Sequence, residues 1–160
     1  MTISMRLIFV TGFVFALGIG PPKPSKQQLS LSIGTMEQTL KIGSEASIQT
    51  TLTNISDHKI QFFDRNPDCD YVTYLRDING NLVRETSYKQ RLDCTRRLTD
   101  ARNISVILKP RESRQEEIPL TRLYDLTQPG KYFVQVVREI PKELGGGIIR
   151  SNTLTITMQY

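Results

Sequence analysis

The sequence contains no tryptophan and one histidine among 160 residues. A Ser/His/Asp or Cys/His catalytic arrangement would therefore have to use His58, which lies in the polar run Ser56-Asp57-His58-Lys59. Such a run predicts a solvated turn, and the chain also lacks a Gly-x-Ser-x-Gly nucleophile elbow. We therefore expect no enzymatic activity and no cofactor.

A cluster of charge of one sign is missing as well. The 21 Lys and Arg residues outnumber the 16 Asp and Glu residues, which gives a net charge of +5, but the two signs are interspersed. A nucleic-acid-binding surface needs basic residues gathered on one face, so we expect no nucleic-acid partner. The 6 Phe and 6 Tyr residues, with the branched aliphatic ones, suffice for one hydrophobic core.

No apolar run reaches the length of about 20 residues that a membrane-spanning helix needs. The longest such run, residues 7–19, follows Arg6 and has the length of the apolar region of a signal peptide. Ala16 and Gly18 form a small-residue cleavage pattern, so we predict a signal peptide over residues 1–18, a Pro-rich spacer over 19–28 and a domain over 29–160. The alternative is an uncleaved anchor.

This interpretation places the domain outside the cytoplasm, as a secreted or periplasmic protein of bacterial type, without stable membrane insertion after cleavage. No Cys lies directly after the apolar run, which argues against a lipid anchor. Cys69 and Cys94 are then expected to form a disulfide. Closing this loop would stabilise the fold by about 3.5 kcal/mol in the chain-entropy model. Two thiols alone are too few ligands for a structural metal.

Alternation of apolar and polar residues predicts most of the strands. They are expected at residues 29–33, 46–54, 60–63, 71–76, 103–108, 114–120, 131–138 and 148–159, with weaker patterning over 36–42. The segment 84–102 is polar and less periodic, so it is expected to be an irregular crossover. Leu123 and Leu126 have the spacing of one short helical turn.

Turn residues separate these strands. Pro129-Gly130 predicts a type II turn, and Tyr132 just after it matches the tyrosine corner of Greek-key sandwiches. Asn79-Gly80 predicts a type I′ hairpin. With about seven to nine strands and no long helical pattern, we predict an all-β, immunoglobulin-like Greek-key β-sandwich.

The order of these motifs resembles bacterial exported immunoglobulin-like or fibronectin-like domains. It is similar to the domain of the bacterial intracellular-proteinase-inhibitor family over residues 46–137, through Asn54-Ile55-Ser56, the hairpin at 79–80, Leu108-Lys109-Pro110 and Pro129-Gly130-Lys131-Tyr132. The resemblance implies a sandwich in which Leu52 and Val134 stand where antibody-type domains have their inter-sheet cysteines. Phe62 would replace the strand tryptophan of those domains.

The stretch 64–70 contains side-chain oxygens at every second residue: Asp64, Asn66, Asp68 and Asp70. This spacing could wrap Ca²⁺, but Cys69 stands where an EF-hand loop needs glycine, and Leu75 stands in place of its bidentate glutamate. The favoured interpretation is a polar turn without metal, and calcium binding remains the alternative.

Two further features have a functional and a structural interpretation. Residues 84–102 contain six basic side chains, which would form an anion-binding patch or a solvated crossover: Arg84, Lys89, Arg91, Arg96, Arg97 and Arg102. Tyr71, Tyr74 and Tyr88 could add a contact surface to it. Gly145-Gly146-Gly147 is either a flexible recognition loop, reminiscent of one loop of immunoglobulin-like protease inhibitors, or a plain hairpin tip.

Asn54-Ile55-Ser56 and Asn103-Ile104-Ser105 match glycosylation acceptors, although a bacterial origin makes their modification unexpected. The sequence as a whole predicts an exported, non-catalytic binding or structural module whose partner is a protein or glycan of the cell envelope. The alternative function is a proteinase inhibitor that acts through an exposed loop, either 66–69 or the glycine loop.

Overall fold

The computed structural model describes residues 27–94 and 104–160. The predicted signal peptide and most of the spacer lie outside these residues, as do Arg96, Arg97, Arg102 and Asn103. Within the described part, no helix is long and apolar enough to cross a bilayer.

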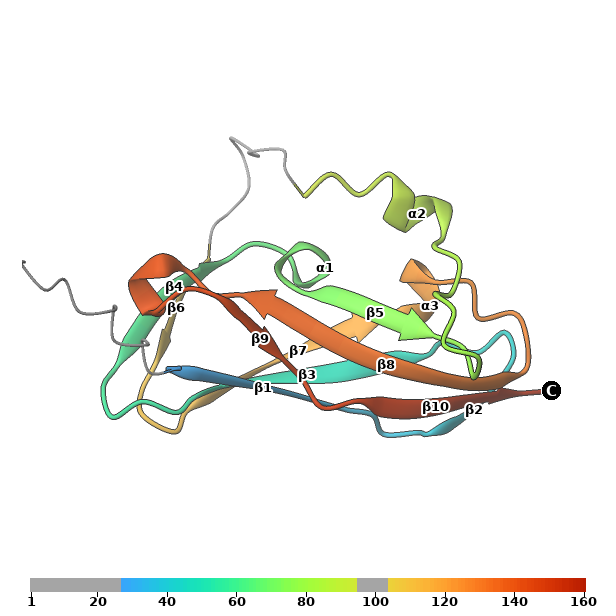
Figure 1. Cartoon of the computed structure of the whole chain (residues 1–160), viewed down its shortest axis with the longest axis horizontal. Helices are drawn as coiled ribbons and strands as arrows, with labels where there is room; N and C mark the ends of the chain where they lie inside the picture. Colours follow the sequence, from blue (N-terminus) through green and yellow to red (C-terminus); the bar gives the residue numbers. More distant parts are fainter. Residues whose placement is uncertain (1–26, 95–103) are drawn as a thin grey trace, which may run out of the picture.

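The protein is an all-β sandwich (Figure 1). One sheet has the order β1 (Leu29–Gly34), β3 (Ser47–Asn54) and β7 (Ser113–Pro119). The other has the order β2 (Thr39–Lys41), β10 (Leu154–Gln159), β8 (Gly130–Glu139) and β5 (Val72–Arg76), and β9 (Ile148–Arg150) also pairs with β8. A separate pair consists of β4 (Ile60–Asp64) and β6 (Ile104–Leu108).

Consecutive parts of the chain change sheet repeatedly. The chain passes from β3 in the first sheet to β5 in the second, returns to the first sheet at β7, and crosses again to β8. Neighbouring strands within a sheet are therefore mostly distant in sequence, as in immunoglobulin-like Greek-key sandwiches. The predicted fold class is confirmed, although the described residues form ten strands and not seven to nine, because the last predicted strand is divided and a short strand, β2, adds to the second sheet.

The core lies between the inner faces of the two sheets. On β8, Tyr132, Val134 and Val136 are buried, as their alternation predicts. Leu52 of β3 and Val134 of β8 are both fully buried, so aliphatic side chains from both sheets fill this part of the core. Phe62 is buried as expected, but it lies on β4, with its ring 5.0 Å from the Arg138 guanidinium.

The corner before β8 is a tyrosine corner, but it is not a type II turn. The hydroxyl of Tyr132 donates to the carbonyl of Gln128 at 2.8 Å, four residues upstream, as the sequence predicts. Gly130, however, has φ of 154° and is already the first residue of β8. A type II turn needs φ near +80° at its second central residue, which would be Gly130 here, so the predicted turn type is wrong.

The predicted type I′ turn at Asn79-Gly80 is also wrong. Gly80 has φ of 83°, but Asn79 does not share the positive φ that a type I′ turn requires. The carboxylate of Asp77 explains the difference, because its Oδ1 accepts from the backbone N–H groups of Asn79 and Asn81, at 2.9 Å each. This side-chain cap favours an ordinary turn that closes with the Gly80 N–H to Asp77 carbonyl bond of 3.0 Å.

Two expected irregular stretches contain single helical turns. They are α1 (Pro67–Asp70) and α2 (Ser87–Gln90), and a third turn, α3 (Leu120–Leu123), precedes the corner. Asn66 caps α1 by accepting from the Asp68 N–H at 3.1 Å, with Pro67 at the first helical position. The helical turn expected at 123–126 lies three residues earlier, in α3.

The last predicted strand, 148–159, is divided into β9 and β10. At the break, Ser151 accepts the Val136 N–H through its hydroxyl at 2.9 Å. The side chain of Asn152 then bonds both backbone groups of Ile33 on β1, at 2.9 and 3.1 Å. The break therefore connects the two sheets at the edge of β1.

Candidate functional site

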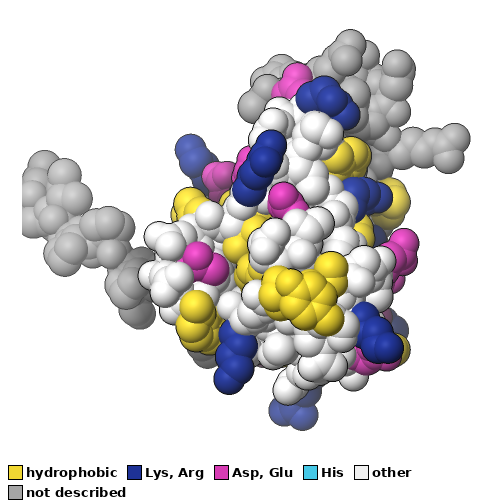
Figure 2. Space-filling model, turned by 90° about the vertical axis from the view of Figure 1, so that its right-hand side faces the viewer, with side chains coloured by type: hydrophobic (Ala, Val, Ile, Leu, Met, Phe, Trp, Pro, Cys, Tyr) yellow, Lys and Arg dark blue, Asp and Glu magenta, His cyan; other side chains and the backbone are white. Residues whose placement is uncertain are grey.

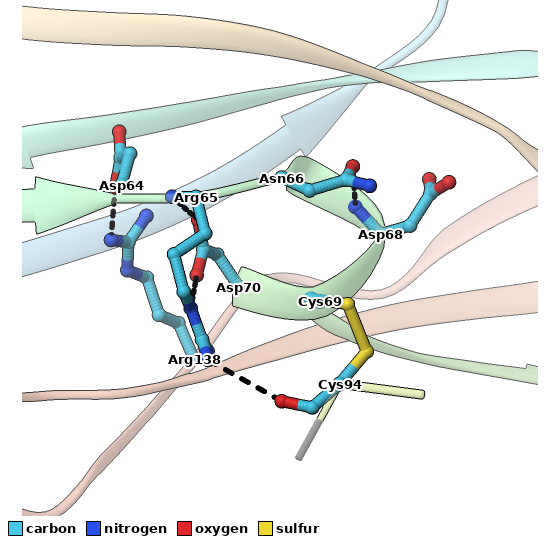
Figure 3. Close-up of polar contacts among 8 residues, drawn as sticks. All are labelled: Asp64, Arg65, Asn66, Asp68, Cys69, Asp70, Cys94 and Arg138. Atoms are coloured by element: carbon cyan, nitrogen blue, oxygen red, sulfur yellow. Dashed lines mark hydrogen bonds and ion pairs between the residues drawn. A yellow bond between two sulfur atoms is a disulfide. The ribbon is translucent and has the colours of Figure 1, made fainter. Parts of the chain in front are cut away.

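The four candidate calcium ligands each have a different partner, and Figure 3 draws contacts of Asp64, Asn66 and Asp70. Asp64 contacts Arg138, and its Oδ2 lies 2.7 Å from Nε of Arg114. Asp70 accepts from the backbone N–H and from Nε of Arg65, at 2.7 and 3.2 Å. Each of these two carboxylates is therefore neutralised by arginine.

The side chains of Asn66 and Asp68 also have partners within the protein. Asn66 caps α1, while Asp68 contacts Arg122 and accepts from the hydroxyl of Tyr88 at 2.8 Å. The helical geometry of 67–70 explains why the alternating oxygens do not share a face, since side chains turn by about 100° per residue there and not 180°. Among the described residues, no group of three or more His, Cys, Asp or Glu could surround a metal ion.

The pair Asp64–Arg138 is buried between β4 and β8, with 2% and 5% of each residue exposed. The Arg138 guanidinium lies 5.0 Å from the ring centres of both Phe62 and Tyr71. Burial is the largest single influence on Arg138 and opposes its charged form, but Tyr71 and Asp64 together outweigh burial and raise the pKa of Arg138. For Tyr71, burial disfavours the charged form of the hydroxyl and raises its pKa. This arrangement connects two strands 74 residues apart, and the sequence contains no local signal for it.

Residues 83–94 form an arm that leaves β5 after the hairpin and carries α2 (Figure 1). The disulfide Cys69–Cys94 is present, as the sequence predicts, and connects the end of the arm to α1 with a Cα–Cα distance of 5.3 Å. Near its start, backbone bonds join Thr86 N–H to the Leu123 carbonyl at 3.0 Å and Asp125 N–H to the Arg84 carbonyl at 2.9 Å.

Side chains of α2 complete the attachment. Tyr88 bonds Asp68, which raises the pKa of the Tyr88 hydroxyl, and its ring lies 4.9 Å from the Arg122 guanidinium. Lys89 lies 3.9 Å from the ring centre of Tyr124, and its Nζ is 3.0 Å from Glu85. No residue of α2 is buried. The arm is therefore attached by polar contacts, cation–π contacts and one disulfide, without an apolar core of its own.

These contacts change the predicted basic patch. Lys89 is directed inward onto Tyr124, and the side chain of Lys89 is only 20% exposed. Tyr71 is 2% exposed, so its prediction as a contact residue is wrong, because its ring packs beside Arg138. Tyr74 and Tyr88 are 39% and 37% exposed. Of the three described basic residues in segment 84–102, Lys89 is therefore engaged within the fold, whereas Arg84 and Arg91 are exposed.

A groove of about 640 Å³ lies between the arm, the β2–β3 turn and the α3–β8 connection. We call it the arm groove. Its lining is rich in hydroxyl, carboxylate and amide groups and consists of Gly43, Ser44, Glu45, Arg84, Glu85, Thr86, Ser87, Gln90, Thr121, Tyr124, Asp125, Leu126 and Thr127. Asp125 accepts from the hydroxyl and N–H of Thr127, and these bonds lower the pKa of its carboxyl. The sequence did not single out this groove, because its walls come from three separated segments.

Figure 2 looks onto the end of the sandwich where the C-terminus lies. Basic and acidic side chains are interspersed on this face, and the apolar ones appear as separate small areas. No large field of one sign is visible there, in agreement with the scattered charges of the sequence.

The remaining predicted sites lie elsewhere. The side chain of His58 is 58% exposed, and its Nδ1 is 3.0 Å from Asp57. Asn54 is fully buried, and its amide donates to the carbonyls of His58 and Leu108, so it cannot accept a glycan in the folded domain. Gly145-Gly146-Gly147 ends the β8–β9 hairpin, which closes with the Ile140 N–H to Gly147 carbonyl bond of 2.8 Å. All three glycines have positive φ, so this turn depends on glycine.

No family model matches the chain, and no curated protein does. Among solved structures, it is similar to the CARDB domain of the PF1109 protein from Pyrococcus furiosus. The solution structure of that domain gives 13% identity over 82% of this chain and 94% of that chain, with a TM-score of 0.40. The crystal structure of that domain in complex with di-metal ions gives 14% identity over 82% of this chain and 87% of that chain, with a TM-score of 0.44.

A β-glucosidase from Listeria innocua in complex with isofagomine gives 15% identity over 81% of this chain and 16% of that chain, with a TM-score of 0.44. With TM-scores below 0.5, none of these likenesses supports an argument about function. The comparisons do not indicate a proteinase-inhibitor family.

Proposed function

We propose that this protein is an exported, non-catalytic binding module of the cell envelope, and that its partner occupies the arm groove. The observation that carries the proposal is the attachment of the arm by the Cys69–Cys94 disulfide and by contacts from α2 to α1 and α3. A groove whose walls are fixed before binding loses less conformational entropy when the partner binds.

The lining of the arm groove indicates the chemistry of this partner. Glu45 comes from the β2–β3 turn and Ser87 from the arm, and Gln90 adds an amide. Hydroxyl, carboxylate and amide groups recognise ligands with many hydrogen-bonding groups, such as a glycan or the backbone of an extended peptide. The volume of about 640 Å³ falls within the range of ligand sites.

The use of charged side chains also favours binding over catalysis. Asp64, Asp68 and Asp70 are each engaged by arginine, so they serve the architecture around the arm. An extracellular or periplasmic location is compatible with the disulfide. We retain export as part of the proposal.

The alternative is a proteinase inhibitor that acts through an exposed loop. The stretch 66–69 is poorly suited to this role, since it forms the start of α1, with Asp68 nearly buried. The glycine loop is better suited, because Lys142 and Glu143 are exposed at the tip of a closed hairpin. If this alternative is correct, micromolar protein slows at least one protease of a broad panel, and replacing Lys142 and Glu143 by alanine removes the effect.

The arm groove is tested by capture from a native envelope extract with immobilised domain, followed by identification of the bound molecules. The variant Glu45→Ala/Gln90→Ala changes two groove side chains, and Glu139→Ala removes an exposed carboxylate of β8 as a matched control. We expect the groove variant to lose the partner and the control to retain it. Equal capture by wild type and both variants would contradict a partner in the arm groove.

A further inference from the structure

A second hollow, of about 670 Å³, shares no lining residue with the arm groove. It lies between the β3–β4 turn and the β6–β7 turn, beside the residues that lead into β1. We call it the turn cleft, and its lining consists of Gln27, Gln28, Ile55, Ser56, Asp57, His58, Pro110 and Arg111.

Arg111 has an unusual backbone conformation. Its φ is 66°, and it is the one non-glycine residue in the described part of the chain with a positive φ. The turn closes with the Glu112 N–H to Lys109 carbonyl bond of 3.0 Å, which makes Pro110-Arg111 the central pair of a type II turn. Glycine or asparagine is favoured at the second position of such a pair, because a left-handed conformation is strained for other side chains.

The surrounding structure imposes this conformation. Arg111 N–H donates to the Asn54 carbonyl at 2.9 Å, and Asn54 N–H donates to the Glu112 carbonyl at 3.0 Å. The buried Asn54 amide also bonds the carbonyls of His58 and Leu108, at 2.8 and 3.0 Å. Asn54 therefore connects both turns that border the cleft, and the position of Arg111 is fixed before any ligand binds.

An arginine kept at a strained position on the wall of a fixed cleft indicates a role for its side chain. The guanidinium is exposed, always charged and able to bond an oxyanion through two parallel N–H groups. Lys109 lies two residues away in the same turn, and the Glu112 carboxylate that follows is occupied by the Lys109 N–H at 2.7 Å. The electrostatics of this turn thus favour an anion.

The rest of the lining indicates a ligand larger than a simple ion. Ile55 is 50% exposed, and Pro110 adds a second apolar surface. Ser56 and the amides of Gln27 and Gln28 supply polar groups around them. Asp57 and His58 complete the lining, and the Asp57 carboxylate lies 3.0 Å from Nδ1 of His58. A volume of about 670 Å³ has room for a small organic molecule that carries an anionic head.

We propose that the turn cleft binds a small organic oxyanion, a carboxylate or a phosphate monoester with a short apolar part, and that Arg111 is its anion-binding residue. The strain at Arg111 is then maintained for binding, because glycine would satisfy the turn better but could not contact the anion. This site is independent of the partner proposed for the arm groove.

The test is a titration of the whole protein, followed by amide chemical shifts at constant pH and ionic strength, with four probes: acetate, hexanoate, inorganic phosphate and hexyl phosphate. We expect saturable shifts at the amides of residues 55–58, 109, 111 and 112, with tighter binding of hexanoate and hexyl phosphate than of acetate and inorganic phosphate. The preferred head group distinguishes a carboxylate from a phosphate ligand. Absence of saturable shifts with all four probes would overturn the proposal.

The variants Arg111→Gly and Arg111→Asn remove the guanidinium but suit a left-handed conformation. We expect both to melt at or above the wild-type temperature and to bind the best probe at least tenfold more weakly. Arg111→Lys keeps a charge without the paired N–H groups and should bind with intermediate affinity. Arg150→Ala, which removes an exposed arginine of β9, is the control and should bind as wild type does. Unchanged affinity in the folded Gly and Asn variants would refute the role of Arg111.

Discussion

Tyr132 shows at the scale of one residue how the corner is joined to the core. Its ring is buried beside Val134 and Val136, and its hydroxyl donates to the Gln128 carbonyl at 2.8 Å. The variant Tyr132→Phe keeps the ring and removes this bond, so we expect a loss of about 1 kcal/mol in the free energy of unfolding. Urea denaturation measures it, with Tyr160→Phe at the exposed C-terminus as the control. Equal midpoints for Tyr132→Phe and wild type would mean that the bond contributes nothing.

Asp64 is a second single residue with a structural role, and we expect it to contribute more to the free energy of unfolding than the Tyr132 hydroxyl does. Its carboxylate is buried against Arg138 and also pairs with Arg114. The variant Asp64→Ala leaves Arg138 buried without its carboxylate, which typically costs about 3–5 kcal/mol. Asp57→Ala changes a fully exposed side chain and should cost less than about 0.5 kcal/mol. If the two variants unfold at the same denaturant concentration, the buried pair is not structural.

Local sequence signals predicted single residues well where the cause was local. The tyrosine corner depends on residues 128–132, and the burial of Val134 and Val136 depends on strand alternation. The contact of Asp64 with Arg138 joins positions 74 residues apart, so no window of the sequence contains it. The spacing of 64–70 instead indicated a calcium loop, because four oxygen side chains look alike in sequence whether they meet a metal or arginines.

At the scale of one element, the arm is attached to the sandwich without an apolar core of its own. It has no buried residue in α2, and its far end is attached through Cys69–Cys94. We expect the variant Cys69→Ala/Cys94→Ala to lose a few kcal/mol, at most about 3.5, while the sandwich stays folded. Urea denaturation measures the loss in the free energy of unfolding, and far-ultraviolet circular dichroism shows whether the β-sheets are retained.

Mild reduction of the wild-type protein should reproduce the result of the double variant. Loss of the β-sheet circular dichroism signal in either experiment would show that the disulfide supports the whole fold and not only the arm.

Most elements were predictable because strand alternation and turn residues are short-range. The exceptions have physical reasons. The break between β9 and β10 arises where Asn152 bonds Ile33 of another sheet, a contact 119 residues apart. The turn at 77–81 is set by the Asp77 carboxylate, which outweighs the preference of Asn79-Gly80. The arm groove could not be predicted, since three separate segments form its walls.

At the scale of the whole molecule, buried tyrosines predict how stability depends on pH. Burial raises the pKa of Tyr71 and Tyr124 above the ordinary value of 10.0. Above that pH the unfolded chain releases these protons while the folded protein retains them. The contribution of these tyrosines to the free energy of unfolding is therefore complete below pH 10 and is lost as the pH rises toward and through their folded-state pKa values.

We accordingly expect the free energy of unfolding in urea to fall as the pH rises above about 10. The variant Tyr71→Phe should show a shallower fall, because it removes one of the groups that titrate. A stability that is constant or rising over this interval, or an identical slope in the variant, would contradict the burial of these hydroxyls.

The central claim is that the sandwich carries an arm fixed against it, so that the arm groove exists before any partner binds. Amide hydrogen exchange of the free, oxidised protein tests this claim most directly. We predict slow exchange at Thr86, Gln90 and Asp125, whose N–H groups bond the Leu123, Thr86 and Arg84 carbonyls, alongside slow exchange in β8. Exchange of these three amides at the rate of an unstructured peptide, with β8 still protected, would contradict a preformed groove.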